Sequence, residues 1–209
     1  MRILVFGASG NTGKEIVRQA LGRGDIITAF VREPAKLGGI APVSRVIQGN
    51  VNDQKAVAAA IPGHDAVVSA LGVGKPLTHD PDVIAGIRHI TGAMEHHGVG
   101  RLVYLSFIGV TESRHAVGFA LRFAARVPLR HEIADHEAKE AQIISSGLDW
   151  TIVRPPKLTN GPRTERYRVG DDISTWAPLP LLSRADLAHF ILDELSQQRF
   201  VRKAPRLLH

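Results

Sequence analysis

Apolar runs alternate along the whole chain with segments of helical spacing. Ile3–Phe6 is a continuous apolar run, and Ile16, Val17, Ala20 and Leu21 then recur at intervals of three and four residues. Runs of the first kind predict strands over residues 2–6, 26–31, 44–49, 66–70, 101–106 and 150–154. Segments of the second kind predict helices over residues 12–21, 53–61, 81–97, 131–146 and 184–195, with Ser183 as the N-cap of the last.

This alternation determines the expected fold class. The run 66–70 is apolar on both faces, as in a parallel sheet that is covered on two sides. We therefore predict an α/β protein: a single Rossmann-type domain over residues 1–209 with a doubly wound parallel sheet. Two irregular excursions, 109–130 and 155–182, follow strand carboxyl ends. We expect them to face the substrate, although simple packing on the rim is the alternative.

Composition narrows the class of protein. The 209 residues are 44% hydrophobic, which is enough for a sizeable core, and they include no cysteine, which excludes disulfides, thiolate metal sites and a cysteine nucleophile. With no membrane-spanning run and a strand that begins at Arg2, we expect a soluble, cytoplasmic protein without a signal peptide. The net charge of +6 comes from scattered basic residues. This favours a solvated basic surface with a few charges for a phosphorylated cofactor, and leaves nucleic acid binding as a minor alternative.

The most informative motif is a glycine-rich turn between the first strand and the first helix. Glycines at positions 7, 10 and 13 permit a tight turn, close approach of a ligand to the backbone, and close packing of helix on strand. The helix N-terminus directs free N–H groups and a partial positive charge at the same place, which suits a phosphate. We predict a dinucleotide site in which the pyrophosphate contacts Gly7, Ser9, Gly10, Asn11, Thr12 and Gly13; a turn that is merely tightly packed is the alternative.

The residue after the second strand predicts which nicotinamide cofactor binds. Arg32 stands there, nineteen residues after Gly13 (32 − 13), and its planar guanidinium matches the 2′-phosphate of NADP(H). Lys36 adds a second positive charge one turn later. Glu33 could instead hold the ribose of NAD, and an ordinary surface salt bridge of Arg32 is the other alternative, but the pattern favours NADP(H).

Other cofactor contacts are expected from strand order alone. Asn50 and Val51 follow the third strand and are placed to meet the adenine; Leu71 and Gly72 follow the fourth and allow the cofactor to come close. Lys75 lies just beyond them and could reach a phosphate of the cofactor, although a solvated side chain is the favoured interpretation. Pro155 follows the sixth strand and is expected to border the nicotinamide end.

Several of these motifs together resemble a known family. The turn GASGNTG at 7–13, Val31-Arg32, Leu71-Gly72 and the stretch SGLDWTIVRPP at 146–156 are similar to the atypical short-chain dehydrogenase/reductases. With SRADLAHF at 183–190, they most resemble the NAD(P)H-binding group that contains biliverdin/flavin reductases and nitrogen-repressor-like proteins. The resemblance implies NADPH-dependent reduction of flavins, biliverdins or quinones, and a role for Lys36 at the 2′-phosphate.

The resemblance also implies two catalytic residues. Ser106 occupies the position of the family's active-site hydroxyl, although Phe107 replaces the second residue of the usual pair, and His136 matches a histidine near the nicotinamide in the flavin reductase branch. A histidine there can donate a proton or hold the substrate. The departures are the missing Tyr-x-x-x-Lys, since Asp135 stands four residues before Lys139, and Asn50 in place of an aspartate.

We therefore expect an NADPH-dependent oxidoreductase that reduces a small conjugated acceptor (flavin, quinone or tetrapyrrole) by hydride transfer. A non-catalytic NADP(H)-binding redox sensor is the alternative, and the absence of Tyr-x-x-x-Lys favours it. The histidine and carboxylate pairs of 131–136 are too few for a metal site, so no metal is expected. The sequence leaves a monomer and a homodimer open, as it does the choice between lid and interface for 109–130.

Overall fold

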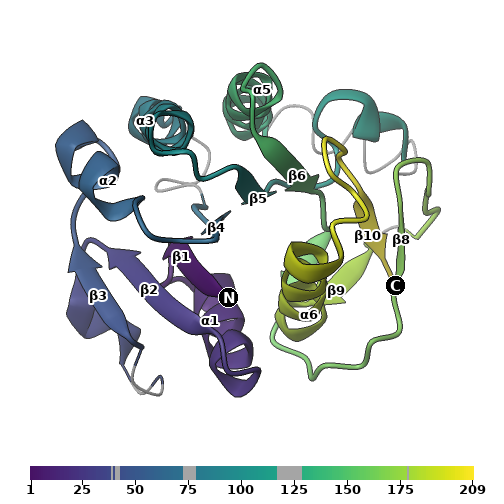
Figure 1. The fold of residues 1–209 in the computed structure, drawn as a ribbon. Helices are drawn as coiled ribbons and strands as arrows, with labels where there is room; N and C mark the ends of the chain where they lie inside the picture. The colour runs from purple at the N-terminus through teal and green to yellow at the C-terminus, as the bar shows by residue number, and fades with distance from the viewer. Residues whose placement is uncertain (39, 41–42, 73–78, 117–128, 178) are drawn as a thin grey trace.

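The computed structural model describes residues 1–38, 40, 43–72, 79–116, 129–177 and 179–209, and all structural statements below refer to these (Figure 1). A six-stranded parallel sheet in the order β3-β2-β1-β4-β5-β6 forms its centre. Its strands are β1 (Arg2–Phe6), β2 (Ile26–Val31), β3 (Arg45–Gln48), β4 (Ala66–Ser69), β5 (Arg101–Leu105) and β6 (Asp149–Val153). This order confirms the predicted doubly wound α/β fold, and each predicted strand is present to within one residue at either end.

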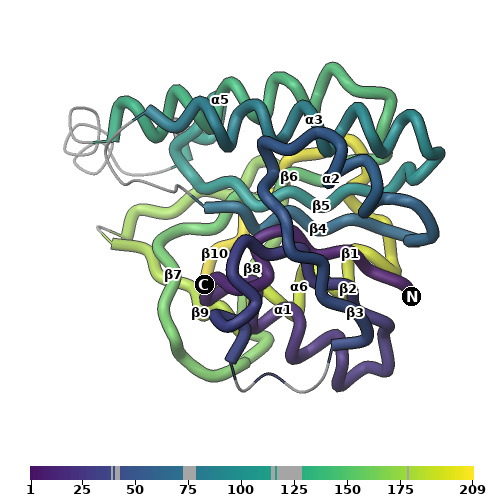
Figure 2. Tube along the Cα trace, turned by 90° about the vertical axis from the view of Figure 1, so that its left-hand side faces the viewer, coloured from purple at the N-terminus to yellow at the C-terminus, as the bar shows by residue number. Residues whose placement is uncertain are grey.

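Helices cover both faces of the sheet, as Figures 1 and 2 show. One face carries α1 (Asn11–Gly22) and α6 (Arg184–Gln197); the other carries α2 (Gln54–Ala60), α3 (Pro81–His97) and α5 (Arg130–Ile144). Alternate side chains of β1 pack into the hydrophobic cores on the two faces of the sheet. Ile3 and Val5 join the core cluster that includes α1 and α6. Leu4 and Phe6 join the cluster that includes α2, α3 and α5.

Side-chain caps explain why two of the helices begin where they do. The Asp53 carboxylate accepts hydrogen bonds from the N–H groups of Lys55 and Ala56, both at 3.0 Å, and starts α2. The Ser183 hydroxyl accepts from the N–H of Asp186 at 2.9 Å and starts α6, which confirms the predicted N-cap.

The two predicted excursions contain short elements that the hydrophobic pattern did not indicate. Besides the 3₁₀ helix η1 (Pro34–Leu37), the structure has η2 (Thr111–Ala116) within 109–130; residues 117–128 of that excursion lie outside the described residues. In the second excursion, β7 (Lys157–Thr159) pairs with β9 (Leu181–Ser183), and β8 (Arg168–Gly170) pairs with β10 (Arg206–Leu208). Strands of three residues are too short for periodicity to reveal. In the part of the chain described, no helix combines the length and hydrophobicity needed to cross a membrane.

Candidate functional site

At two of the three glycines in the turn after β1, a side chain would overlap the protein's own backbone. Gly7 has φ +77°, and a Cβ there would lie 2.6 Å from the carbonyl oxygen of Ala70, at the end of β4. A Cβ on Gly13 would lie 2.1 Å from the carbonyl oxygen of Gly7. These contacts bring the start of α1 directly against the turn and the turn against β4.

Gly10 is different, because a side chain there would overlap no backbone atom. It is exposed, has φ −73°, and its nearest neighbour to an added Cβ is the Gly7 carbonyl oxygen at 3.4 Å. It is also the N-cap of α1, and the first helical bond runs from the N–H of Lys14 to its carbonyl at 2.8 Å. The N–H groups of residues 11–13 precede that bond, and the first turn contains no acidic side chain. The turn therefore fits a diphosphate, with backbone donors beneath it and room above residue 10.

Arg32 follows β2 and is exposed. Within the described part of the chain, its guanidinium forms no salt bridge with a carboxylate and no hydrogen bond, so its donors are available to a ligand. Lys36, on η1, is already paired: its Nζ lies 2.7 Å from Oε1 of Glu33, and this hydrogen bond lowers the pKa of the Glu33 carboxyl. The pair is exposed and hence easily broken. Both residues remain predicted 2′-phosphate ligands, with Lys36 bound to Glu33 in the structure described.

The residues after β3 and β4 lie where strand order placed them. The Asn50 side chain accepts a hydrogen bond from the N–H of Asn52 at 3.1 Å, and Val51 is buried against α3. Leu71 is half-buried, and Gly72 is exposed with open space around its Cα. Their contacts with a cofactor remain predictions. Lys75 falls outside the described residues.

The ends of β5 and β6 are tied together. The N–H of Ser106 donates to the carbonyl of Val153 at 2.9 Å, and the N–H of Ile108 donates to the carbonyl of Pro155 at 2.8 Å. Pro155 is buried at this edge. These two hydrogen bonds hold Ser106 and Pro155 at the same edge of the sheet.

The structure brings Ser106 and His136 together and adds Tyr104. Tyr104 and Ser106 lie two residues apart, so their side chains share one face of the sheet. Nδ1 of His136, on α5, lies 3.1 Å from the Tyr104 hydroxyl and 3.3 Å from the Ser106 hydroxyl. The Phe107 ring meets the imidazole edge-on with centroids 4.9 Å apart. Sequence reasoning gave Tyr104 no role because Ile108, and not a lysine, stands four residues later. Its position two residues before Ser106 on the same strand was the signal that could have identified it.

Burial keeps this cluster uncharged. It lowers the pKa of His136 to about 3, with a further contribution from nearby Lys139, so the imidazole is neutral at physiological pH. Burial also raises the pKa of the Tyr104 hydroxyl, as do the carboxylates of Glu140 and Asp135. Of the two roles expected for His136, the neutral ring suits holding the substrate or orienting a hydroxyl better than donating a proton as imidazolium.

Two charged clusters hold α5 in place around the histidine. Asp135 is buried, pairs with Nδ1 of His79, and accepts a hydrogen bond from the N–H of Asp80 at 2.7 Å. Its neighbour Lys139 is equally buried, and burial lowers its pKa. These contacts join α5 to the start of α3 and fix the histidine relative to β5.

On the other side of α5, Arg154 and Glu140 form a buried ion pair. The Nε and Nη2 atoms of Arg154 lie 3.1 and 2.6 Å from the two carboxylate oxygens of Glu140. Arg154 also contacts Glu112 and donates to the Thr111 hydroxyl at 2.7 Å. The end of β6 is therefore joined to both α5 and η2.

The described residues include no group of three or more histidine and acidic side chains placed to hold a metal ion. The features that remain are a turn that fits a diphosphate, an available cation after β2 and a neutral hydroxyl–imidazole cluster beyond β5. In this fold such features lie along the carboxyl edge of the sheet, where nucleotides bind.

Comparison with known proteins agrees with this arrangement. The sequence profile of the NAD(P)H-binding family matches residues 7–198, from the first glycine of the turn to the end of α6. This chain belongs to that family. The resemblance to the atypical short-chain dehydrogenase/reductases is confirmed, and NAD(P)H is the cofactor class of the domain.

The individual relatives have low sequence identity to this chain. The 2-alkyl-3-oxoalkanoate reductase of Stenotrophomonas maltophilia (strain K279a) is 27% identical over 219 residues, which cover 93% of this chain and 66% of that protein. The chain thus spans about two thirds of that relative's length. Two solved structures share the fold. ChuY, an anaerobillin reductase from Escherichia coli O157:H7, has a TM-score of 0.83 at 20% identity and covers 100% of this chain and 97% of its own. A wide-type short-chain dehydrogenase/reductase from Veillonella parvula DSM 2008, in complex with NADP, has a TM-score of 0.83 at 18% identity, with coverage of 100% and 94%.

Proposed function

We propose that the protein is an NADPH-dependent reductase that transfers hydride to a small conjugated acceptor such as a flavin, quinone or tetrapyrrole. The observation that carries the proposal is the turn at the exposed Gly10, where the first N–H groups of α1 have no partner within the helix and an added Cβ would have one neighbouring atom, at 3.4 Å. Membership of the NAD(P)H-binding family supports the cofactor class. The reductase named among its relatives supports the reaction class.

The preference for NADPH over NADH rests on Arg32. Its guanidinium has no carboxylate partner among the described residues and stands where a 2′-phosphate would be recognised. Arg32→Glu is expected to weaken NADPH binding by at least tenfold and to leave NADH binding within about threefold of the wild type. Arg45→Glu is the matched control, since it makes the same charge reversal at the opposite, amino-terminal edge of the sheet. Unchanged discrimination in Arg32→Glu would contradict the assignment.

The chemistry beyond β5 requires positioning rather than strong acid catalysis. Bound with its nicotinamide near Pro155, the cofactor would supply a hydride. A conjugated acceptor spreads the arriving charge, so neutral hydrogen bonds from Ser106, Tyr104 and His136 are sufficient to orient it and to pass a proton. Reduction of an isolated ketone would need a stronger acid than this neutral cluster provides.

The test is steady-state NADPH oxidation with FMN, menadione and biliverdin as separate acceptors. At least one is expected to be reduced, and Tyr104→Phe is expected to lower kcat for it by about tenfold with little change in the Kd of NADPH. Thr151→Ser, on the neighbouring strand β6 but in contact with Glu194 instead of His136, serves as control.

A non-catalytic NADP(H) sensor is the competing function. The observation that favours it is the neutral, buried His136 in a chain without the Tyr-x-x-x-Lys acid. Tight NADPH binding without oxidation by any of the three acceptors would support the sensor and refute the reductase.

A further inference from the structure

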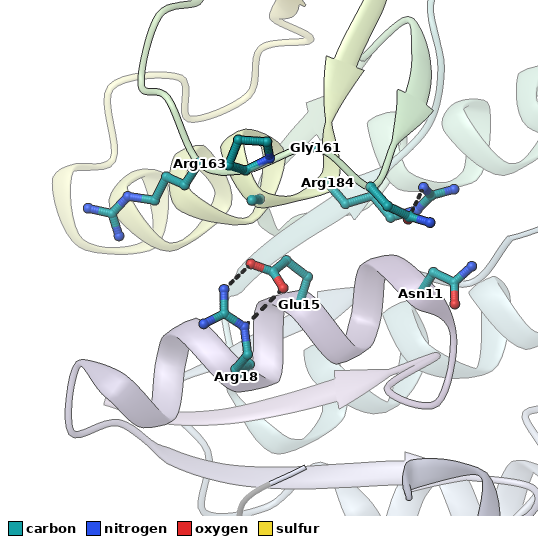
Figure 3. A pocket seen from close by; sticks show the side chains of 9 residues that line it. Asn11, Glu15, Arg18, Gly161, Arg163 and Arg184 are labelled. Atoms are coloured by element: carbon teal, nitrogen blue, oxygen red, sulfur yellow. Dashed lines mark hydrogen bonds and ion pairs between the residues drawn. The ribbon is translucent and has the colours of Figure 1, made fainter. Parts of the chain in front are cut away.

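A polar cavity of about 350 Å³ lies between α1 and the segment that follows β7 (Figure 3). Its floor is formed by α1, and its roof by residues 160–163 and the first turn of α6. The side chains around it include three arginines, at positions 18, 163 and 184. The sequence analysis assigned no role to any of them.

Two of these arginines are already neutralised. The Nε of Arg18 lies 3.0 Å from Oε2 of Glu15, and the Nε of Arg163 lies 2.9 Å from Oε1 of Glu165. Arg184 differs from both. Its Nη1 donates to the amide oxygen of Asn160 at 2.7 Å, and the described residues provide it with no carboxylate. Its Nε is buried without a hydrogen-bond partner. One uncompensated positive charge therefore faces the cavity.

The roof that carries this charge is held firmly. The carboxylate of Asp186 accepts hydrogen bonds from the N–H groups of Thr164 and Glu165, both at 2.7 Å, and from the hydroxyls of Thr164 and Ser183, both at 2.9 Å. Burial alone would raise the pKa of Asp186, but the hydrogen bonds outweigh it and the pKa is lowered. Asp186 therefore ties the segment after residue 163 to the start of α6, the helix that carries Arg184.

The cavity also adjoins the glycine turn. Asn11, the first residue of α1, lines it, and Figure 3 shows Arg184 and Asn11 at the same end on opposite walls. Arg163 lies at the other end, and its guanidinium points away from Asn11. An anionic group between Arg184 and Asn11 would meet both the guanidinium and the partial positive charge at the start of α1.

We propose that this cavity is a phosphate subsite in which Arg184 and Asn11 bind a phosphoryl group beside the glycine turn. The phosphate has two sources: the diphosphate of the cofactor, or a phosphate carried by the acceptor. The second source rests on the proposed reductase function, whereas the first requires only nucleotide binding.

Three variants and equilibrium binding test the proposal without relying on turnover. Arg184→Gln removes the charge, Arg184→Lys retains it, and Arg163→Gln removes a charge that lines the same cavity but is paired with Glu165. NADPH is the first probe. FMN and riboflavin, which share a ring system and differ by one phosphate, are the second and third, and both are titrated in the presence of NADP⁺. The melting temperature with and without sodium diphosphate is a further readout, and the melting temperature of each free variant reports its folding.

In each supporting outcome, the effect is largest in Arg184→Gln and absent in Arg163→Gln. A Kd for NADPH raised about tenfold, the size of one lost charge-assisted hydrogen bond, would identify the cofactor as the source. A similar rise in the Kd for FMN, with the Kd for riboflavin unchanged, would identify the acceptor as the source of the phosphate.

If wild type bound no nucleotide, the proposed function would fail. A diphosphate-induced rise in melting temperature that Arg184→Gln abolishes would still support the subsite. Arg184→Lys should lie between wild type and Arg184→Gln. Equal effects of Arg184→Gln and Arg163→Gln, or no effect of either on any probe, would overturn the subsite.

Discussion

Gly10 and Gly13 stand in one turn, yet alanine at the two positions should have opposite consequences. At Gly13 the added Cβ would lie 2.1 Å from the carbonyl oxygen of Gly7 and 2.8 Å from Cα of Ala8, both backbone atoms. Such an overlap forces the turn and α1 apart, at a cost of about 3 kcal/mol by analogy with overpacked cores. At Gly10 the same methyl group meets one atom at 3.4 Å, with a backbone conformation that alanine adopts freely.

These contacts translate into separate assays. For a chain of this length, 1 kcal/mol corresponds to about 2–4 °C, so Gly13→Ala should lower the melting temperature by about 6–12 °C. Gly10→Ala should lower it by no more than about 4 °C, the effect of replacing a glycine N-cap by alanine. Its methyl group would instead occupy the space proposed for the diphosphate and raise the Kd of NADPH by at least tenfold. Thermal unfolding by circular dichroism and NADPH fluorescence titration measure the two quantities.

The two variants control for each other. A well-folded Gly10→Ala protein that binds NADPH as tightly as wild type would refute the placement of the diphosphate at this turn. A Gly13→Ala protein as stable as wild type would show that the turn and α1 are less closely packed than the 2.1 Å contact requires.

Two further predictions concern buried charges. Glu140→Gln removes the buried carboxylate partner of Arg154 and leaves it only the exposed Glu112 as a carboxylate partner among the described residues, so it should destabilise the fold by about 3–5 kcal/mol in urea unfolding. Glu15→Gln, which breaks a more exposed pair, should cost less than about 1 kcal/mol; equal costs would contradict the buried pairing. His136 has a folded-state pKa of about 3 against 6.5 for an ordinary histidine, so between these values the unfolded chain binds the extra proton and stability falls as the pH is lowered, by up to about 1.4 kcal/mol per pH unit from this group. His136→Asn should remove that share of the pH dependence between pH 6.5 and 4, and an unchanged slope would show that the imidazole is not held neutral by burial.

The sequence by itself determined the sheet, the helices that cover it and the glycine turn. Each depends on local information: an apolar run such as Ile3–Phe6, the recurrence of Ile16 and Val17 at helical spacing, and glycines three residues apart. Because strands alternate with helices throughout, a parallel, doubly wound sheet could be predicted from topology rules without any knowledge of contacts. Residue patterns also pointed to the NAD(P)H-binding family, and that resemblance singled out Ser106 and His136 as candidate catalytic residues.

Only the tertiary structure decided which side chains meet. Tyr104 reaches His136 across 32 positions of sequence, and no local pattern marks that pairing. The same holds for the cavity beside Asn11, whose walls come from α1 and from residues 160–163 and 184–185. The protonation state of His136 was likewise decided by the tertiary structure. Its pKa is low because the folded chain excludes water from the imidazole, and this burial arises from packing between segments far apart in sequence. Secondary structure is encoded locally, whereas the site's charges and partners result from long-range packing.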